Sequence, residues 1–128
     1  MKFDYTVTTE KSFDVAIQSA QEAIATAGMR VLHIHDVHQT LSEKGYERGP
    51  LKIIEFCNAK LAYEALNADM NISLWLPCRL SVYVKDGKTV VSAIRPAFLS
   101  QFFPNTELNE KFEGLDATIR NIVDNTAK

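Results

Sequence analysis

The chain has 128 residues, of which 46% are hydrophobic and 23% charged, and its formal net charge is −2. A chain of this size buries roughly two thirds of the surface of its unfolded form, so we expect a single globular domain over residues 1–128. Acidic and basic residues are interspersed with no Lys/Arg stripe, which argues against a nucleic-acid partner. No apolar stretch suits a secretory signal or a membrane span, so we expect a cytoplasmic protein with no membrane partner.

The first half of the chain alternates between strand and helix patterns. Residues 3–7 alternate apolar and polar side chains, which predicts a half-buried strand. A 3.6-residue apolar period predicts a helix over residues 13–27, and the β-branched residues 31–35 predict a second strand. A short helix follows at residues 36–44, with Asp36 as its N-cap.

The second half is predicted to contain three strands and two helices. Residues 51–56 predict a strand that is apolar on both faces, and a helix begins just after Asn58. Two strands joined by a tight Asp86-Gly87 hairpin follow Pro77, and the last helix begins at about Glu107. This order predicts an α+β two-layer domain in which helices, including a long C-terminal one, cover a sheet.

Residues 97–103 carry more apolar side chain than a solvated loop normally does. Phe98, Leu99, Phe102 and Phe103 all fall within this short segment. We expect it to form either a lid over the edge of the core or part of a contact between subunits.

Cys57 and Cys78 are the only cysteines and the first candidates for chemistry. Cys57 would lie where a strand gives way to a helix, and the helix N-terminus would lower the pKa of its thiol. Asn58 can cap that helix, and Pro77 fixes the backbone just before Cys78. The alternative is that both cysteines pack as small hydrophobic residues. Their spacing matches no metal or redox motif.

All three histidines, His33, His35 and His38, lie close together in the sequence. His33 and His35 are two residues apart, so a strand would present both on one face, and Val31 would share that face. With Cys57 and Cys78 these two histidines would make a ligand set for a transition metal such as zinc, provided that the strands bring all four together. The alternative is a pair of exposed histidines that bind nothing.

Glu55 is the charged exception in an apolar strand. Burial would raise the pKa of its carboxyl and make it a general base beside a thiol. The alternative is an ion pair across the sheet with Lys52, Arg79 or Lys85. Asp36 and Lys44 also have two interpretations. Each could contact a ligand, or Asp36 could simply cap a helix and Lys44 lie at a solvated helix end.

The motifs Asp36-Val37, Cys57-Asn58-Ala59-Lys60, Leu76-Pro77-Cys78 and Asp86-Gly87-Lys88, taken together, resemble family 302 of the domains of unknown function. The resemblance implies a small α+β domain with a curved, mostly antiparallel sheet, found in bacteria and archaea as a protein that associates with itself. It points to Cys57, Asn58, Pro77 and Cys78 as the matching site positions, with Asp36 and Lys44 as weaker matches. It supplies no activity.

Three functions remain open at this stage. The first is a ligand- or metal-binding or sensing module whose site lies near Cys57 and Cys78, with Asn58, Glu55 and His35 beside them. The second is a thiol redox protein that uses either an exchangeable Cys57-Cys78 pair or a single reactive thiolate at Cys57. The third is a structural homodimer without a site, joined through the apolar segment 98–103. Whether the protein is an enzyme is undecided, because no oxyanion hole or orienting group accompanies a Cys57-His35 pair.

Overall fold

The computed structural model describes residues 1–128 and contains one five-stranded sheet. The strands are β1 (Asp4–Thr9), β2 (Arg30–Asp36), β3 (Leu51–Cys57), β4 (Cys78–Lys85) and β5 (Lys88–Ile94). Their order across the sheet is β1-β5-β4-β3-β2, and all neighbouring pairs are antiparallel. The first strand therefore pairs with the last one and forms one edge of the sheet.

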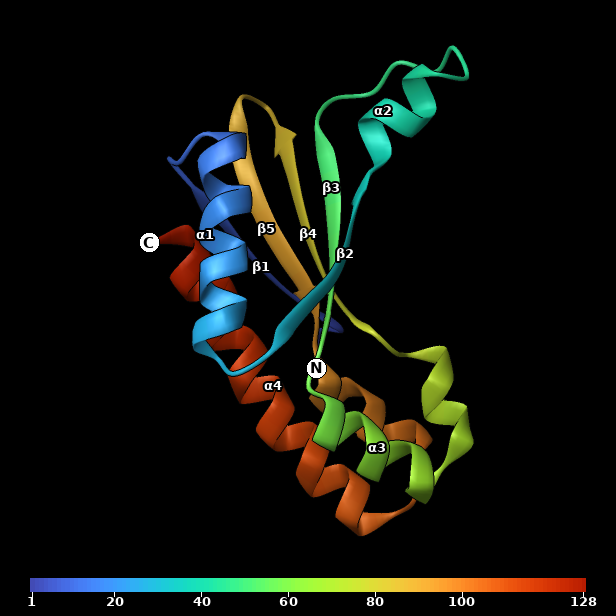
Figure 1. The fold of residues 1–128 in the computed structure, drawn as a ribbon. Coiled ribbons are helices and arrows are strands. Elements are labelled where there is room, and N and C mark those ends of the chain that lie inside the picture. The colour runs from blue at the N-terminus through green and yellow to red at the C-terminus, as the bar shows by residue number, and fades with distance from the viewer.

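Two helices cover one face of this sheet. The helices are α1 (Phe13–Thr26), α2 (Val37–Ser42), α3 (Ala59–Ala68) and α4 (Thr106–Ala127), with 3-10 helices η1 (Met70–Leu74) and η2 (Pro96–Phe102). Helices α1 and α4 lie on the same side of the sheet, α3 lies below one end of it, and α2 projects at the other end (Figure 1). The predicted α+β class is confirmed, with a long C-terminal helix over an antiparallel sheet. None of the helices combines the length and apolar character needed to cross a membrane.

The predicted element boundaries follow from local capping chemistry. Asp36 Oδ1 accepts a hydrogen bond from the Gln39 N–H at 3.0 Å, which satisfies one of the free donors at the start of α2. Asn58 Oδ1 does the same for α3 by accepting from the Leu61 N–H at 3.2 Å. In the predicted hairpin, Asp86 and Gly87 have φ angles of 52° and 76°, as a type I′ turn requires.

A β-bulge in β2 changes which side chains share a face. Val31 is opposite Phe56 and His33 is opposite Glu55, so Leu32 has no partner on β3. His33 and His35 share one face, as predicted, but the prediction that Val31 lies on the same face is wrong. Val31 packs against the core under α1 and α4 instead, because the extra residue restarts the alternation.

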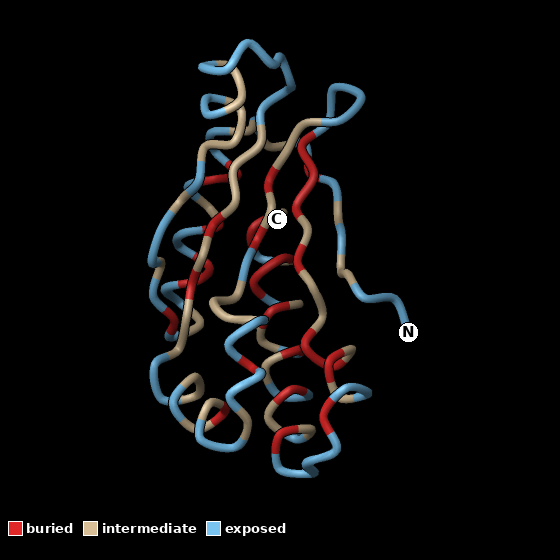
Figure 2. Tube along the Cα trace, turned by 90° about the vertical axis from the view of Figure 1, so that its right-hand side faces the viewer, coloured by how far each residue is buried: buried red, intermediate tan, exposed pale blue.

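The core consists of two clusters. The larger one joins the helix-covered face of the sheet, including Ile54, Phe56 and Leu80, to α1 and α4. The smaller one lies beyond the end of the sheet and contains Leu99 and Phe103 from the apolar segment predicted as a lid or subunit contact. Figure 2 shows the buried stretches continuing from the strands into the helices below them. A large apolar side chain in either cluster contributes on the order of 2 kcal/mol to the free energy of folding when it is fully buried.

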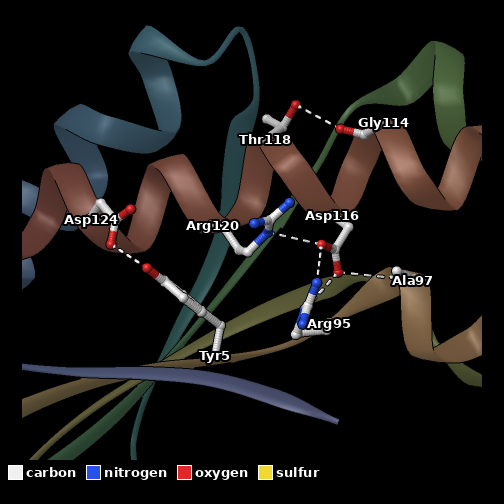
Figure 3. A network of polar contacts seen from close by, with 8 residues as sticks. All are labelled: Tyr5, Arg95, Ala97, Gly114, Asp116, Thr118, Arg120 and Asp124. Carbon is white, nitrogen blue, oxygen red and sulfur yellow. Dashed lines mark hydrogen bonds and ion pairs between the residues drawn. The ribbon is translucent and has the colours of Figure 1, made fainter. Parts of the chain in front are cut away.

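A buried carboxylate ties the smaller cluster to the sheet. Asp116 on α4 is 1% exposed. Its Oδ1 accepts hydrogen bonds from Arg95 Nε at 3.2 Å and from the Ala97 N–H at 3.1 Å. Its Oδ2 accepts from Arg95 Nη2 and from Arg120 Nε, both at 2.9 Å (Figure 3). The end of β5, the start of η2 and the middle of α4 are thereby joined at one side chain.

The pKa of Asp116 reflects how strongly these hydrogen bonds and charges stabilise the ionised carboxylate. Burial by itself raises the pKa of a carboxyl, but the hydrogen bonds from Arg95 and Ala97 and the charges of Arg95 and Arg120 outweigh it. The net pKa of Asp116 is lower than that of an ordinary aspartate. The ionised form therefore stabilises the fold above the unfolded-state pKa of about 3.9, and this contribution is lost as the pH falls through the folded-state pKa.

We expect Asp116→Asn to lower the free energy of unfolding by about 3 kcal/mol at pH 7, because both arginines lose their buried counter-charge. Urea unfolding at pH 7 and at pH 3 measures this loss, which should shrink at the lower pH. The matched control is Glu110→Gln, which removes a carboxylate from an exposed position on the same helix. Equal stabilities of the Asp116 and Glu110 variants would contradict a structural role for the network.

Candidate functional site

An apolar pocket lies between the end of the sheet and helices α3, η1, η2 and α4. Fourteen of its 17 lining residues are hydrophobic, which makes it suited to apolar or soft ligands. The space between its walls, with the open mouth included, is about 680 Å³. The part wide enough for water-sized molecules is a cavity of only about 50 Å³, so the pocket as it stands has room only for a very small molecule.

Both cysteines line this pocket. Cys78 is the first residue of β4 and lies opposite Phe56, the residue before Cys57. The two cysteines thus lie on adjacent strands, one register position apart, at the end of the sheet where the chain turns into α3. Cys78 also packs against the larger core cluster, as its strand parity predicted.

Asn58 and Lys111 are the polar residues of the pocket lining. The side-chain oxygen of Asn58 caps α3, which leaves its NH₂ group as the free polar group of that side chain. Lys111 Nζ pairs with Glu64 Oε2 at 2.5 Å, and Lys111 is the one charged residue of the lining. Because Lys111 is paired with Glu64, the NH₂ group of Asn58 is the side-chain amide donor left for a ligand with electron-rich atoms.

The thiol of Cys57 is not activated. Burial raises the pKa of Cys57, so the prediction that the start of a helix lowers this pKa is wrong. Burial, followed by the nearby charge of Cys57, raises the pKa of Cys78 to about 11. For Cys57 the cause is burial, because loss of hydration penalises the charged thiolate.

Glu55 belongs to a different surface, the sheet face opposite α1 and α4. Its carboxylate accepts a hydrogen bond from His35 Nε2 at 3.0 Å and pairs with Arg79 Nε at 3.7 Å. The structure therefore has the cross-strand ion pair rather than a base beside a thiol. The ring of His33 lies 4.3 Å from that of His35, centre to centre, on the same face.

The four residues predicted as zinc ligands do not come together. His35 lies opposite Ile53, towards the other end of β3 from Cys57, and the register fixes this separation. His38 is engaged elsewhere, because its Nδ1 contacts the carbonyl oxygen of Arg48. No group of three or more His, Cys, Asp and Glu side chains is arranged to hold a metal ion.

The remaining predicted site residues divide between two places. Asp36 caps α2 and lies opposite Lys52, at the far end of β3 from Cys57, and Lys44 is exposed beyond α2. Pro77 lines a separate hollow on the sheet face that carries Glu55. Only Cys57, Asn58 and Cys78 among the predicted ligand-binding residues share the apolar pocket.

Sequence reasoning missed several walls of this pocket. Met29, Leu61, Leu99, Lys111 and Phe112 all line it. The available signal was the apolar stripe of the last helix, which continues further towards its N-terminus than the sheet requires. The extra length of this apolar stripe predicts that the helix packs against a second set of residues besides the sheet, but it does not identify those residues.

The family of the chain follows from comparison with known proteins. A family model described as "Domain of unknown function DUF302" matches residues 5–126. The chain belongs to the DUF302 family. The crystal structure of an uncharacterized conserved DUF302 protein from Bacillus stearothermophilus is similar to it, with a TM-score of 0.92 and 28% sequence identity over 98% of this chain and 99% of that one. No curated protein matches the chain.

Two of the motifs that carry the resemblance to DUF302 meet in space. Cys57 and Asn58 from the first motif and Leu76 and Cys78 from the second all line the apolar pocket. These motifs are far apart in the sequence, and antiparallel pairing of β3 with β4 brings them to the same end of the sheet.

We expect both thiols of this DUF302 protein to react slowly with iodoacetamide at pH 7, and Cys57 to react before Cys78. A thiol with a pKa of about 11 is alkylated on the order of a hundredfold more slowly than free cysteine at that pH, because so little thiolate is present. Mass spectrometry of timed aliquots measures both rates, and the unfolded chain in urea is the control. Labelling of Cys57 faster than free cysteine would show an activated thiolate.

Proposed function

We propose that this DUF302 protein is a small-ligand-binding or sensing module whose site is the apolar pocket. The observation that carries the proposal is the enclosure of Cys57, Asn58 and Cys78 by hydrophobic walls from four different helical segments and the end of the sheet. A concave, largely apolar site with a few polar groups is the usual form of a small-molecule site.

The other thiol-based function, disulfide exchange between Cys57 and Cys78, has weaker support. Exchange begins with attack by a thiolate, and both pKa values are raised by burial. The same burial is compatible with ligand binding, because it keeps the site dry and strengthens any contact made inside it.

We expect Ala62→Leu to block the pocket, because Ala62 lines it and the added carbons occupy the cavity. Xenon in solution should shift the amide NMR signals of Cys57, Leu61 and Cys78 in the wild type, since dry apolar cavities bind this probe. These shifts should disappear in the variant. Ala68→Leu, on an exposed position of the same helix, is the control and should respond like the wild type.

Two results would count against the binding proposal. One is a wild-type response spread over the surface rather than confined to the pocket. The other is an unchanged response in Ala62→Leu when circular dichroism shows that the variant is folded. Native mass spectrometry of protein purified under reducing conditions then identifies a resident ligand by its mass.

We also propose that the protein forms a homodimer through an aromatic surface, defined here as Phe3, Leu74, Trp75, Phe98 and Phe102. The ring centres of Phe3 and Phe98 are 6.2 Å apart, those of Phe98 and Phe102 are 5.7 Å apart, and those of Trp75 and Phe102 are 6.4 Å apart. Leu74 is 79% exposed and Phe102 56% exposed, so the surface is continuous and faces solvent. Two-fold symmetry brings such a patch against its own copy.

Phe102→Ser should raise the dimer dissociation constant at least about tenfold, because truncation of a central aromatic residue removes more than 1 kcal/mol of binding energy. Sedimentation velocity over a range of concentrations measures the constant. Tyr63→Ser, which changes an aromatic residue that is 69% exposed on α3 and outside the surface, should leave it unchanged. A wild-type protein that stays monomeric at high concentration would rule the homodimer out.

A further inference from the structure

The sheet face opposite α1 and α4 contains a hollow that is separate from the apolar pocket. Both helices lie on one side of the sheet (Figure 1), and the hollow lies on the other side, over β1, β5 and β4. The part of it that is wide enough for water-sized molecules measures about 540 Å³. Small-molecule sites have volumes of roughly 300–1,000 Å³, so the hollow has the size of a ligand site.

A row of small hydroxyl residues forms the floor of this hollow. Thr6 on β1 lies opposite Ser92 on β5, and Ser92 lies opposite Ser81 on β4. Alternation along β4 puts Arg79 and Tyr83, the residues two positions before and after Ser81, on the same face of the sheet. All five residues line the hollow. The hollow therefore exists because a row of short side chains lies between longer ones.

The hydrogen bonds within this floor show which atoms are left for a ligand. Thr6 Oγ1 donates to Asp4 Oδ2 at 2.5 Å and lies 2.5 Å from Ser92 Oγ. Because a hydroxyl has only one hydrogen, Ser92 is the donor in its contact with Thr6. The lone pairs of Ser92 and the second oxygen of Asp4 can then accept hydrogen bonds from a ligand.

Arg79 supplies donors on the same face. Its Nε pairs with Glu55 Oε2 at 3.7 Å, which leaves its two terminal nitrogens to donate to a ligand. Ser81 and Tyr83 add hydroxyls that can both donate and accept. Asp4 and Arg79 are the charged residues of the lining, and their charges cancel. The lining therefore favours a neutral ligand with several hydrogen-bonding groups over an anion or a cation, which one of the two charges would repel.

The rest of the lining is largely apolar. It includes Phe3, Trp75, Pro77 and Ile94. Aromatic side chains offer a large flat area for apolar contact. A ligand that matches the whole lining has hydroxyl groups at its edge and a face of C–H groups, and a sugar ring has both.

We propose that this hollow binds a neutral sugar. The hydroxyl groups of the sugar bond to Asp4, Ser92 and Arg79. Its C–H face packs against Trp75. This site does not depend on the function proposed for the apolar pocket, although Trp75 and Ile94 line both.

The test uses Trp75, the only tryptophan of the chain, as a fluorescent reporter. Glucose, galactose and mannose are titrated into the protein, each as the free sugar and as its methyl glycoside. At least one of them should change the emission with a dissociation constant on the order of 1 mM, because water competes for the hydrogen bonds of an open site. A response to free sugars alone identifies a metabolite, and a response to both forms identifies the end of a sugar chain as a further source.

Thr6→Val and Thr8→Val form a matched pair of variants. Both make the same change on the same face of β1, but Thr6 lines the hollow and Thr8 does not. Thr6→Val keeps the size of the side chain and removes the hydroxyl between Asp4 and Ser92, so it should weaken sugar binding roughly fivefold. Thr8→Val should bind like the wild type. Ser81→Val, which fills the floor, should abolish the response.

Two further variants separate this site from its neighbours. Ala62→Leu changes the apolar pocket but not the hollow, and should leave the sugar response unchanged. Phe102→Ser weakens the proposed dimer, whose aromatic surface shares Phe3, Leu74 and Trp75 with the hollow. This variant should still bind the sugar, because one chain supplies all of the contacts.

The inference is overturned if none of the sugars changes the emission, or if Thr6→Val and Thr8→Val weaken binding equally. Loss of the response in Ala62→Leu or in Phe102→Ser would overturn it too, because the sugar would then lie in the apolar pocket or at the dimer contact. A response to inorganic phosphate without one to any sugar would contradict the neutral ligand. The Thr6 and Thr8 comparison remains decisive even if Ser81→Val does not fold.

Discussion

The buried carboxylate of Asp116 is the interaction on which the rest of this structure depends. It accepts hydrogen bonds from two arginines and from the Ala97 N–H, and so joins the end of the sheet, the η2 segment and α4. Because η2 contributes Leu99 to the apolar pocket, this polar contact also positions a wall of the pocket. Burying a charge costs free energy, yet the Asp116 carboxylate is buried at the point where the end of the sheet, η2 and α4 meet.

The same burial that builds the pocket determines its chemistry. Hydrophobic walls limit the hydration of Cys57 and Cys78, and this loss of hydration raises both thiol pKa values. A reactive nucleophile is therefore disfavoured, whereas a ligand that contacts neutral sulfur is favoured. The N–H groups of Asn58 and Lys111 add the only polar character of the lining.

Contacts between residues close in the sequence were predictable, whereas contacts between residues on different strands were less so. The caps at Asp36 and Asn58 and the Asp86-Gly87 turn were predicted because each depends on residues a few positions apart. The zinc set did not assemble, because the sheet register decides which positions of separate strands meet. The predicted face of Val31 was wrong because the β-bulge in β2 shifts the alternation of side chains. No pattern in the sequence indicates the extra residue of that bulge.

The sequence by itself determined the α+β class, the order of most helices and strands, the family, and the choice of Cys57, Asn58 and Cys78 as candidate site residues. These follow from periodicity, capping and local motifs, which short stretches of chain encode. Only the tertiary structure decided the strand order, the separation of the histidines from the cysteines, and the pocket that adds Met29 and Lys111. The physical reason is that burial and strand register are properties of segments brought together by the fold, and burial reversed the pKa direction that the helix N-terminus alone predicted for Cys57.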